Sequence, residues 1–499
     1  MEKQSRILLM VFIIITTTTT ISPYMAEGSI IGVNWGRKTS HRLIPSMVMD
    51  LLLQNNIRHL KLFSASENVL KALSGGEIAI TITMPNENLR HVFSRDLAAY
   101  YLQERVRKYQ NQNVNIRYLH IGNEPFSKLS HEVLFPNVVS TLRYIQEMLI
   151  RNGYENVTAT TPHYTDVLIP GIKKPSEADF RPDIKEKMVE FITLLNNSKA
   201  PFVVNMFPLI FNGENHWDPE FAFIDNNSNF TIHDDNGLVY KNVFEFIYDS
   251  FLHAIKKAGG GPNVELTVGQ IGWPTDGYLG ATSANAERFF KHLLPFVKSN
   301  KGTPLRPRIS IEVYIHTLVD ENLHKIKMGA FRRHWGVYNN NGQPKYKIDF
   351  SGQGRDMYPT SAKGVVLMPK RWCVFNGNTT NQTLVQQMFD LACQEVDCTS
   401  LSPGGSCHHL NYVQNVSYAF NRFYQNKAQY NNKVFLCEFG GLGKVVLDDP
   451  SVGTCKFPIE ILTAEIADTK GMINMAGHRL SGYWTVLLLS LLLIIGIYM

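Results

Sequence analysis

The sequence predicts an α/β protein: a closed (β/α)8 barrel of the TIM type, followed by a small disulfide-stapled domain. Residues 29–350 alternate short apolar, β-branched segments with longer amphipathic ones, which favours a parallel sheet. Eight such units in roughly 320 residues fit a closed barrel better than an open sheet. All six cysteines come after residue 372, which marks a second unit of different character.

Each expected strand is a short run rich in β-branched and aromatic residues, and each expected helix is an amphipathic stretch. Strands are expected at 29–35, 59–63, 77–84, 116–122, 156–162, 201–207, 264–271 and 310–318. Helices are expected at 42–54, 97–111, 137–152, 183–196, 240–258 and 283–297. A doubly wound open sheet is the alternative, although the glycine-rich dinucleotide turn is absent after the first strand.

The amino-terminal segment, residues 1–28, is interpreted as a secretory signal peptide. Lys3 and Arg6 precede an apolar run, and the small residues Ala26 and Gly28 follow it. A membrane anchor is the alternative, but about nine apolar residues are too few, because a spanning helix needs about 20.

The carboxyl-terminal residues 482–499 form an apolar tail, and small and polar residues precede it within a linker at 459–481. This pattern is typical of a signal for a glycolipid (GPI) anchor, with Asn474 as the expected attachment residue. A single membrane-spanning helix retained in the mature protein is the alternative. We therefore expect a protein secreted to the cell surface, on the outer face of the plasma membrane or in the cell wall.

Glycosylation signals agree with secretion, because Asn-x-Ser/Thr acceptors mark surface loops of secreted chains. They occur at Asn156, Asn196, Asn226, Asn229, Asn378, Asn381 and Asn415. The net charge of +6 is mild, and no long run of Lys and Arg indicates nucleic-acid binding.

The cysteines define the second unit, expected at 371–458 after a Gly-, Ser- and Pro-rich linker at 351–370. They are Cys373, Cys393, Cys398, Cys407, Cys437 and Cys455. Clustered cysteines in a secreted chain indicate a small disulfide framework, whose pairing the spacing leaves open. A zinc site is the alternative, but paired C-x-x-C spacings are missing.

The most informative stretch is YLHIGNEPF at 118–126. It predicts a strand that ends at Glu124, because Pro125 disfavours helix at the residue before it. A Glu at the carboxyl end of a barrel strand is well placed for acid chemistry in a cleft, whereas the alternative is a turn with a solvated Glu.

Other expected strand ends carry amides and aromatic rings, which suit the hydroxyls and ring faces of a sugar. These residues are Asn34, Trp35, Asn123, Asn205, Phe207, Gln270 and Trp273. Rim packing is the alternative for the two tryptophans.

With these motifs in order, the first unit resembles the plant β-1,3-glucanases of glycoside hydrolase family 17. The matching motifs are IGVNWG at 31–36, IGNEPF at 121–126, NMFP at 205–208, GQIGWPTDG at 269–277, VDEN at 319–322 and HWGVY at 334–338. The resemblance implies a (β/α)8 barrel that acts within β-1,3-glucan (callose), without a cofactor or metal and as a monomer. Lipid-anchored members have a similar apolar tail.

The six-cysteine unit resembles the callose-binding module often attached to these enzymes. The matching motifs are RWCVFNG, LACQEVDC, SPGGSC, SYAFNRFYQ, CEFGG and DDPSVGTC. The resemblance implies carbohydrate binding and three disulfides, Cys373–Cys437, Cys393–Cys398 and Cys407–Cys455.

The resemblance also implies a retaining mechanism with two glutamates, whose carboxyl groups stand about 5 Å apart. Glu124 matches the acid/base, but the nucleophile position holds Gln270, whose neutral amide is unsuited to attack. Asp276, in the loop that follows, is the only plausible substitute.

Further positions of the expected substrate site depart from similar members. His324 stands in place of a Lys, Arg332 in place of a Glu and Phe207 in place of a Tyr, while Glu321 is kept. Two hypotheses remain: an endo-β-1,3-glucanase, and a glucan-binding protein that no longer hydrolyses glucan. Gln270, His324 and Arg332 favour the second.

Overall fold

The computed structural model describes residues 29–90, 94–130, 135–154, 156–261, 264–429 and 437–466. The expected signal peptide, the expected anchor residue Asn474 and the apolar tail at 482–499 lie outside these ranges. Among the residues described, no helix combines the length and apolar character that a membrane crossing requires.

Parallel strands form the centre of the first unit. They are β1 (Ile31–Trp35), β3 (His59–Leu62), β4 (Ala79–Met84), β5 (Ile116–Ile121), β6 (Thr158–Thr160), β7 (Pro162–Tyr164), β8 (Phe202–Met206), β11 (Leu266–Ile271) and β12 (Glu312–Ile315). Their order in the sheet is β6-β5-β4-β3-β1-β12-β11-β8-β7. The two end strands, β6 and β7, are consecutive in the chain and flank Thr161, so the sheet comes round on itself. The predicted barrel is confirmed, with its fifth strand divided in two.

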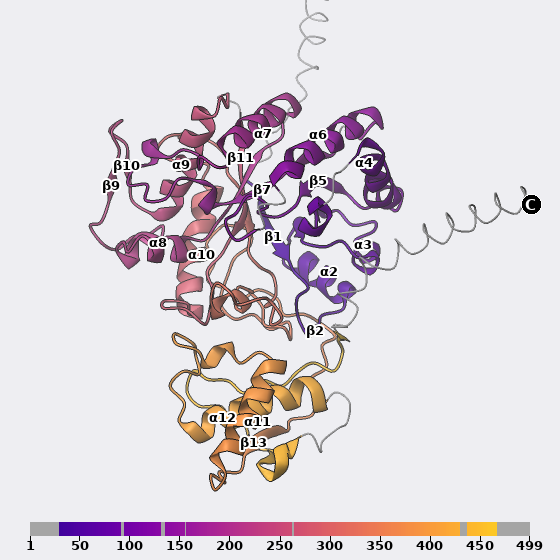
Figure 1. Cartoon of the computed structure of the whole chain (residues 1–499), viewed down its shortest axis with the longest axis vertical. Coiled ribbons are helices and arrows are strands. Elements are labelled where there is room, and N and C mark those ends of the chain that lie inside the picture. Colours follow the sequence, from indigo (N-terminus) through magenta and orange to yellow (C-terminus); the bar gives the residue numbers. More distant parts are fainter. Residues whose placement is uncertain are drawn as a thin grey trace, which may run out of the picture.

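Helices alternate with these strands around the barrel (Figure 1). They are α2 (Pro45–Gln54), α3 (Glu67–Ala72), α4 (Arg95–Leu102), α5 (Lys108–Gln110), α6 (Phe135–Arg151), α7 (Lys185–Ser198), α8 (Pro208–Glu214), α9 (Val243–Lys257) and α10 (Ser283–Lys298). Asn242 and Thr282 cap α9 and α10, because each side chain accepts a hydrogen bond from a backbone N–H in the first turn. Helices α3 and α8 were not predicted from the sequence, because with only 6 and 7 residues they are too short to show a clear helical periodicity.

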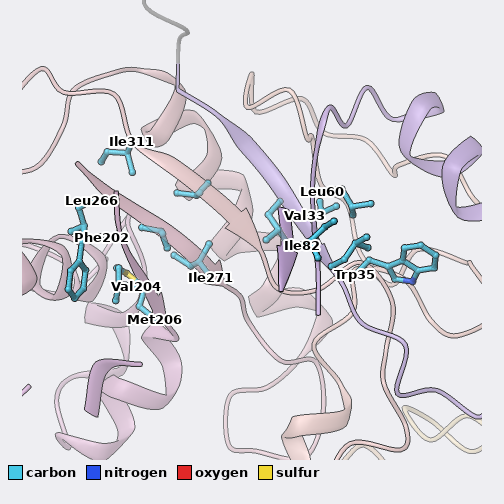
Figure 2. Packing of buried hydrophobic residues seen from close by; sticks show 14 of the residues in the cluster. Val33, Trp35, Leu60, Ile82, Phe202, Val204, Met206, Leu266, Ile271 and Ile311 are labelled. Atoms are coloured by element: carbon cyan, nitrogen blue, oxygen red, sulfur yellow. The ribbon is translucent and has the colours of Figure 1, made fainter. Parts of the chain in front are cut away.

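The barrel core explains why the strands have continuous apolar runs. All residues of β8 and β11 are buried, as expected for parallel strands that are covered on both faces. Figure 2 shows Phe202 and Val204 of β8 near Leu266 of β11, whereas Trp35 lies apart at the carboxyl end of β1.

The second unit, here called the module, packs two helices against a two-stranded sheet. It contains β13 (Trp372–Phe375), α11 (Gln382–Glu395), the short turn η8 (Thr399–Leu401), α12 (Tyr412–Phe423) and β14 (Gly443–Val446). Its disulfides are those that the resemblance implies: Cys373–Cys437, Cys393–Cys398 and Cys407–Cys455. The module lies against one end of the barrel, near β2 (His41–Arg42) (Figure 1).

The segments that lead into and out of the module are held against each other and against the barrel. Ile461 is completely buried in the barrel's hydrophobic core and forms a β-bridge with Leu367. Beyond it, β15 (Glu465–Ile466) pairs antiparallel with β2. Residues 459–466 are therefore part of the folded unit rather than the expected linker, because Ile461 is buried in the hydrophobic core of the barrel.

The expected glycosylation acceptors differ in exposure. Asn156, Asn196, Asn229, Asn378 and Asn381 are exposed, whereas Asn226 and Asn415 are partly buried. The Asn226 amide nitrogen donates to the carbonyl oxygens of Phe230 and Lys241 at 2.9 and 2.7 Å. A glycan at this nitrogen would have to replace both bonds.

The module's disulfides should contribute unequally to its stability. Cys373–Cys437 closes a loop of 64 residues and Cys393–Cys398 a loop of five. In the chain-entropy model, the longer loop gives the larger stabilisation, about 2–5 kcal/mol for a native bridge in a small secreted domain. Cys373→Ala with Cys437→Ala should therefore lower the free energy of unfolding of the oxidised module more than Cys393→Ala with Cys398→Ala, as measured in urea. Equal losses would contradict the loop-length argument.

Candidate active site

The turn after β5 presents Glu124 at the carboxyl end of the barrel. Gly122 and Glu124 both have left-handed backbone angles, with φ of 74° and 54°. For a Glu this conformation costs roughly 1–3 kcal/mol, a strain that is typical of functional sites. Hydrogen bonds from Glu124 N to Pro162 O and from Ser130 Oγ to Glu124 O, at 3.0 and 2.8 Å, hold the turn.

Glu124 is placed as a proton donor. Asn205 at the end of β8 donates to its Oε1 at 2.7 Å, which fixes the direction of the carboxyl group. Burial raises the pKa of Glu124, while the Asn205 hydrogen bond and the charge of Lys61 act in the opposite direction. A carboxyl group that keeps its proton to higher pH suits general acid chemistry.

Asn123 joins three strand ends beside Glu124. Its backbone N–H donates to Asn86 Oδ1 and its carbonyl oxygen accepts from Asn86 Nδ2, at 2.8 and 3.0 Å. Its side-chain oxygen accepts from Gln270 Nε2 at 2.9 Å and from Lys61 Nζ at 3.1 Å. The nucleophile position of the resemblance therefore lies in a hydrogen-bond network next to Glu124, with its amide nitrogen turned to Asn123.

Lys61 is a site residue that the sequence analysis missed. It lies on β3, is completely buried and has its ammonium group 5.1 Å from the centre of the Phe63 ring. Burial lowers the pKa of Lys61 to about 7, although the charge of Glu124 opposes this. The signal was a lysine inside the apolar run His59–Leu62, because lysine is almost never fully buried without a partner.

Asn34 and Trp35 have structural surroundings. Asn34 is completely buried, and its amide nitrogen lies 3.1–3.3 Å from the carbonyl oxygens of Gly269, Tyr314 and Ile315. Asn34 thus links β1 to two neighbouring strands. Trp35 is 5% exposed and lines a small surface pocket with Arg37.

Trp273 packs inside the barrel wall, so rim packing, the alternative for this residue, describes it better than sugar stacking. Its ring is stacked on Phe223 at 4.4 Å and tilted against Phe289 at 5.2 Å. The indole nitrogen donates to Gly280 O at 3.0 Å, and only 1% of the residue is exposed. Its ring faces are therefore already covered by protein.

Phe207 instead belongs to an aromatic cluster near the strand ends. Its ring centre lies 4.6 Å from that of Trp335, 5.4 Å from that of His316 and 6.2 Å from that of Tyr164. Phe207 is partly exposed. Trp335 entered the sequence prediction only as part of the HWGVY motif, because a sequence does not show that its ring contacts Phe207.

The three remaining rim residues have different charge states. The Glu321 carboxylate accepts from Lys38 N at 2.9 Å, and burial raises its pKa. Burial lowers the pKa of His324 to about 3, helped by Lys38 and Arg332, so His324 is neutral at pH 7. Arg332 has its Nη1 2.9 Å from Met328 Sδ, and its charge opposes the rise that burial causes in the pKa of Glu124 and Glu321.

Asp276, the only substitute nucleophile considered from the sequence, is occupied. Its Oδ1 accepts from the backbone N–H groups of Gly277 and Ser406, at 2.8 and 2.6 Å. Its Oδ2 accepts from the hydroxyls of Ser400 and Ser406, both at 2.8 Å. A carboxylate with four donors and 8% exposure is not available to attack a sugar.

Comparisons with known proteins agree with this architecture. Glucan endo-1,3-beta-glucosidases 8 and 5 of Arabidopsis thaliana are each 38% identical, over 87% and 89% of this chain and 90% of their own lengths. CJP38, a beta-1,3-glucanase and allergen of Cryptomeria japonica pollen, superposes with a TM-score of 0.60 at 29% identity, over 64% of this chain and 99% of its own.

Two family models match this chain, one over each of its two folded units. The X8 domain matches residues 371–444. Glycosyl hydrolases family 17 matches residues 31–350, which is most of the chain. This chain therefore belongs to glycosyl hydrolases family 17 and carries an X8 domain after its barrel.

Proposed function

We propose that this protein binds β-1,3-glucan at the cell surface and has lost all or nearly all hydrolysis of it. The observation that carries the proposal is Gln270, a neutral amide beside the acid Glu124. The relatives and the superposed structure are named as β-1,3-glucanases, which supports β-1,3-glucan as the ligand. The X8 domain supports a second carbohydrate contact.

Three carboxylates in the loops that follow β11 and β12 are held by other groups. Glu321 accepts from Lys38 N, and Asp276 has four donors. Asp320 accepts from Lys345 Nζ at 2.7 and 2.9 Å. Since Gln270 has no carboxylate to attack with and these three carboxylates are held by other groups, we infer that the covalent step of a retaining mechanism is lost.

A residual hydrolase is the second candidate, because Glu124 keeps its amide partner Asn205 and a raised pKa. The glucan-binding protein and the residual hydrolase both keep the acid Glu124, but only the hydrolase has a group that attacks the sugar. Hydrolysis by variants at Gln270 therefore distinguishes the two candidate functions.

Wild-type protein should release reducing ends from linear β-1,3-glucan at a rate close to background. Gln270→Glu restores a carboxylate in one nearly isosteric step and should raise the rate at least about a hundredfold, since loss of a nucleophile usually costs several orders of magnitude. The rescue should be partial, because Arg332 can pair with the new carboxylate. Gln270→Glu with His324→Lys and Arg332→Glu should be faster than the single variant.

Gln270→Ala and Glu124→Gln serve as the controls. Robust wild-type hydrolysis that survives Gln270→Ala but is lost in Glu124→Gln would defeat the proposal. It would mean that another group attacks: inverted product stereochemistry would identify water, and retained stereochemistry would identify another carboxylate such as Asp276.

Lys61 should give the folded protein a measurable pH dependence. Its folded pKa of about 7 lies below the 10.5 of an ordinary lysine, so the unfolded chain binds one more proton between these values. The free energy of unfolding of wild type minus that of Lys61→Met should therefore rise with pH from about 7 to about 10, by at most about 1.4 kcal/mol per unit. Urea titrations at several pH values measure this difference.

In Gln270→Glu the new carboxylate loses the donor that Gln270 offers to Asn123 Oδ1, but it lies close to Lys61, which contacts the same oxygen, and its negative charge would raise the pKa of the lysine. The rise in stability attributable to Lys61 should then begin at higher pH. A stability difference between wild type and Lys61→Met that does not change with pH would contradict the buried titration.

The expected anchor is tested directly on membranes. Asn474 and the apolar tail motivate a glycolipid attachment, which would hold a monomeric protein at the outer face of the plasma membrane. Phosphatidylinositol-specific phospholipase C should release the protein into the soluble fraction. Retention on the membrane, with residues 483–499 found in the mature chain by mass spectrometry, would reject a lipid anchor in favour of a spanning helix.

A further inference from the structure

The module and the barrel meet in a buried polar contact, here called the seam. On the barrel side it involves the loops that follow β11 and β12, and on the module side it involves residues 397–406. Asp276 of the barrel is bound by Ser400 and Ser406 of the module, and Arg333 is bound by Asp397. Asp276 and Asp397 are each only 8% exposed. Buried charges with partners specify one arrangement, because separation would leave them unpaired.

Arg333 connects the module to the rim of the barrel. Its Nη1 donates to Asp397 Oδ1 at 2.9 Å, while its Nε donates to the carbonyl oxygen of His324, also at 2.9 Å. Arg332, the residue before it, is close enough to act electrostatically on Glu124. The Arg333 guanidinium thus links the Asp397 carboxylate of the module to two barrel segments, those that contain His324 and Arg332. Both of these residues differ from similar family members.

Thr399 forms a second hydrogen bond between the module and the barrel, next to the bond between Asp397 and Arg333. Its hydroxyl lies 2.6 Å from Asp397 Oδ1 and 2.7 Å from His334 Nε2. Burial would raise the pKa of Asp397, but the neighbouring His334, Arg422 and Arg333 side chains lower it to about 2. Asp397 is therefore charged at neutral pH. Arg333, Asp397, Thr399 and His334 form one chain of hydrogen bonds, in which those to Asp397 are charge-assisted.

The barrel segment held in this way, residues 330–335, borders the candidate active site and is here called the wall. It contains η7 (Ala330–Arg333) and ends at Trp335, whose ring contacts Phe207. The carbonyl oxygen of Trp335 accepts from Thr317 N at 3.1 Å. Movement of this segment would displace both the charge of Arg332 and the aromatic surface of Trp335.

We propose that the module positions the wall, residues 330–335, at the candidate active site, through the contacts of Asp397 and Thr399 with Arg333 and His334. The functional part of this inference rests on the proposed glucan binding. The module then has a role inside the barrel's own site, besides any glucan contact of its own. Asp397, Thr399 and Arg333 are positioning residues, since they act on the ligand through the segment they hold.

The test uses the full-length protein and a pair of closely matched variants. Thr399→Val removes the hydroxyl at nearly constant volume, and Thr399→Ser keeps it. Amide hydrogen exchange of peptides covering 324–338 reports how well the wall is held, without ligand. Binding of a linear β-1,3-linked glucose hexasaccharide is measured by calorimetry, and its protection of the same peptides assigns binding to the cleft.

We expect Thr399→Val to speed exchange in 324–338 and to weaken cleft binding by roughly tenfold, because a buried hydroxyl pairing is lost. Thr399→Ser should stay close to wild type in both measurements. Asp397→Asn should resemble Thr399→Val. Asp225→Asn is the control, since Asp225 pairs with Arg288 within the barrel, and it should leave exchange in 324–338 unchanged.

Wild-type exchange and affinity in both Thr399→Val and Asp397→Asn would overturn the inference. Faster exchange in these variants, with no glucan protection in the wild type, would refute glucan binding in the cleft and still support the positioning of the wall. Near-ultraviolet dichroism checks that each variant is folded.

Discussion

Closure of the parallel sheet is the constraint on which the candidate site and the seam both depend. Parallel strands in a closed ring place all their carboxyl ends at one face, so loops far apart in sequence meet there. Asn86, Asn123 and Gln270, which follow or end three different strands, come within hydrogen-bond distance for this reason. The loops after β11 and β12 are neighbours at the same face, because their strands are paired, and the module is docked on them.

The site is electrostatically unusual for a retaining glycosidase. Such a site places two carboxyl groups against each other, so that one acts as acid and the other as nucleophile. Here the amide Gln270 stands where the resemblance implies the second carboxyl group, and the buried Lys61 lies 3.1 Å from the Asn123 oxygen that Gln270 also contacts. Burial lowers the pKa of Lys61, and the charge of Glu124 opposes this shift.

The barrel and the module are more tightly associated than two domains joined by a mobile linker. Domains joined by a mobile linker usually share modest polar contacts and move relative to one another. In this protein both connecting segments lie on the barrel, and Ile461 reaches its core. Buried carboxylates at the seam bind partners across the boundary. The barrel and module therefore form one structural unit, in which the module can influence the cleft.

The sequence by itself determined the elements and the identity of the key groups. Apolar runs located the eight barrel strands, and Pro125 placed Glu124 at the end of its strand, because these are local effects. Motif order indicated Gln270 as the residue at the position of the second carboxyl group that the resemblance implies. Only the tertiary structure decided the surroundings of Trp273, Asn34 and Asp276, which strand-end logic had grouped with the cleft. Whether a side chain faces a cleft, a packed wall or another domain depends on partners distant in sequence, such as Phe223 for Trp273 and Ser406 for Asp276.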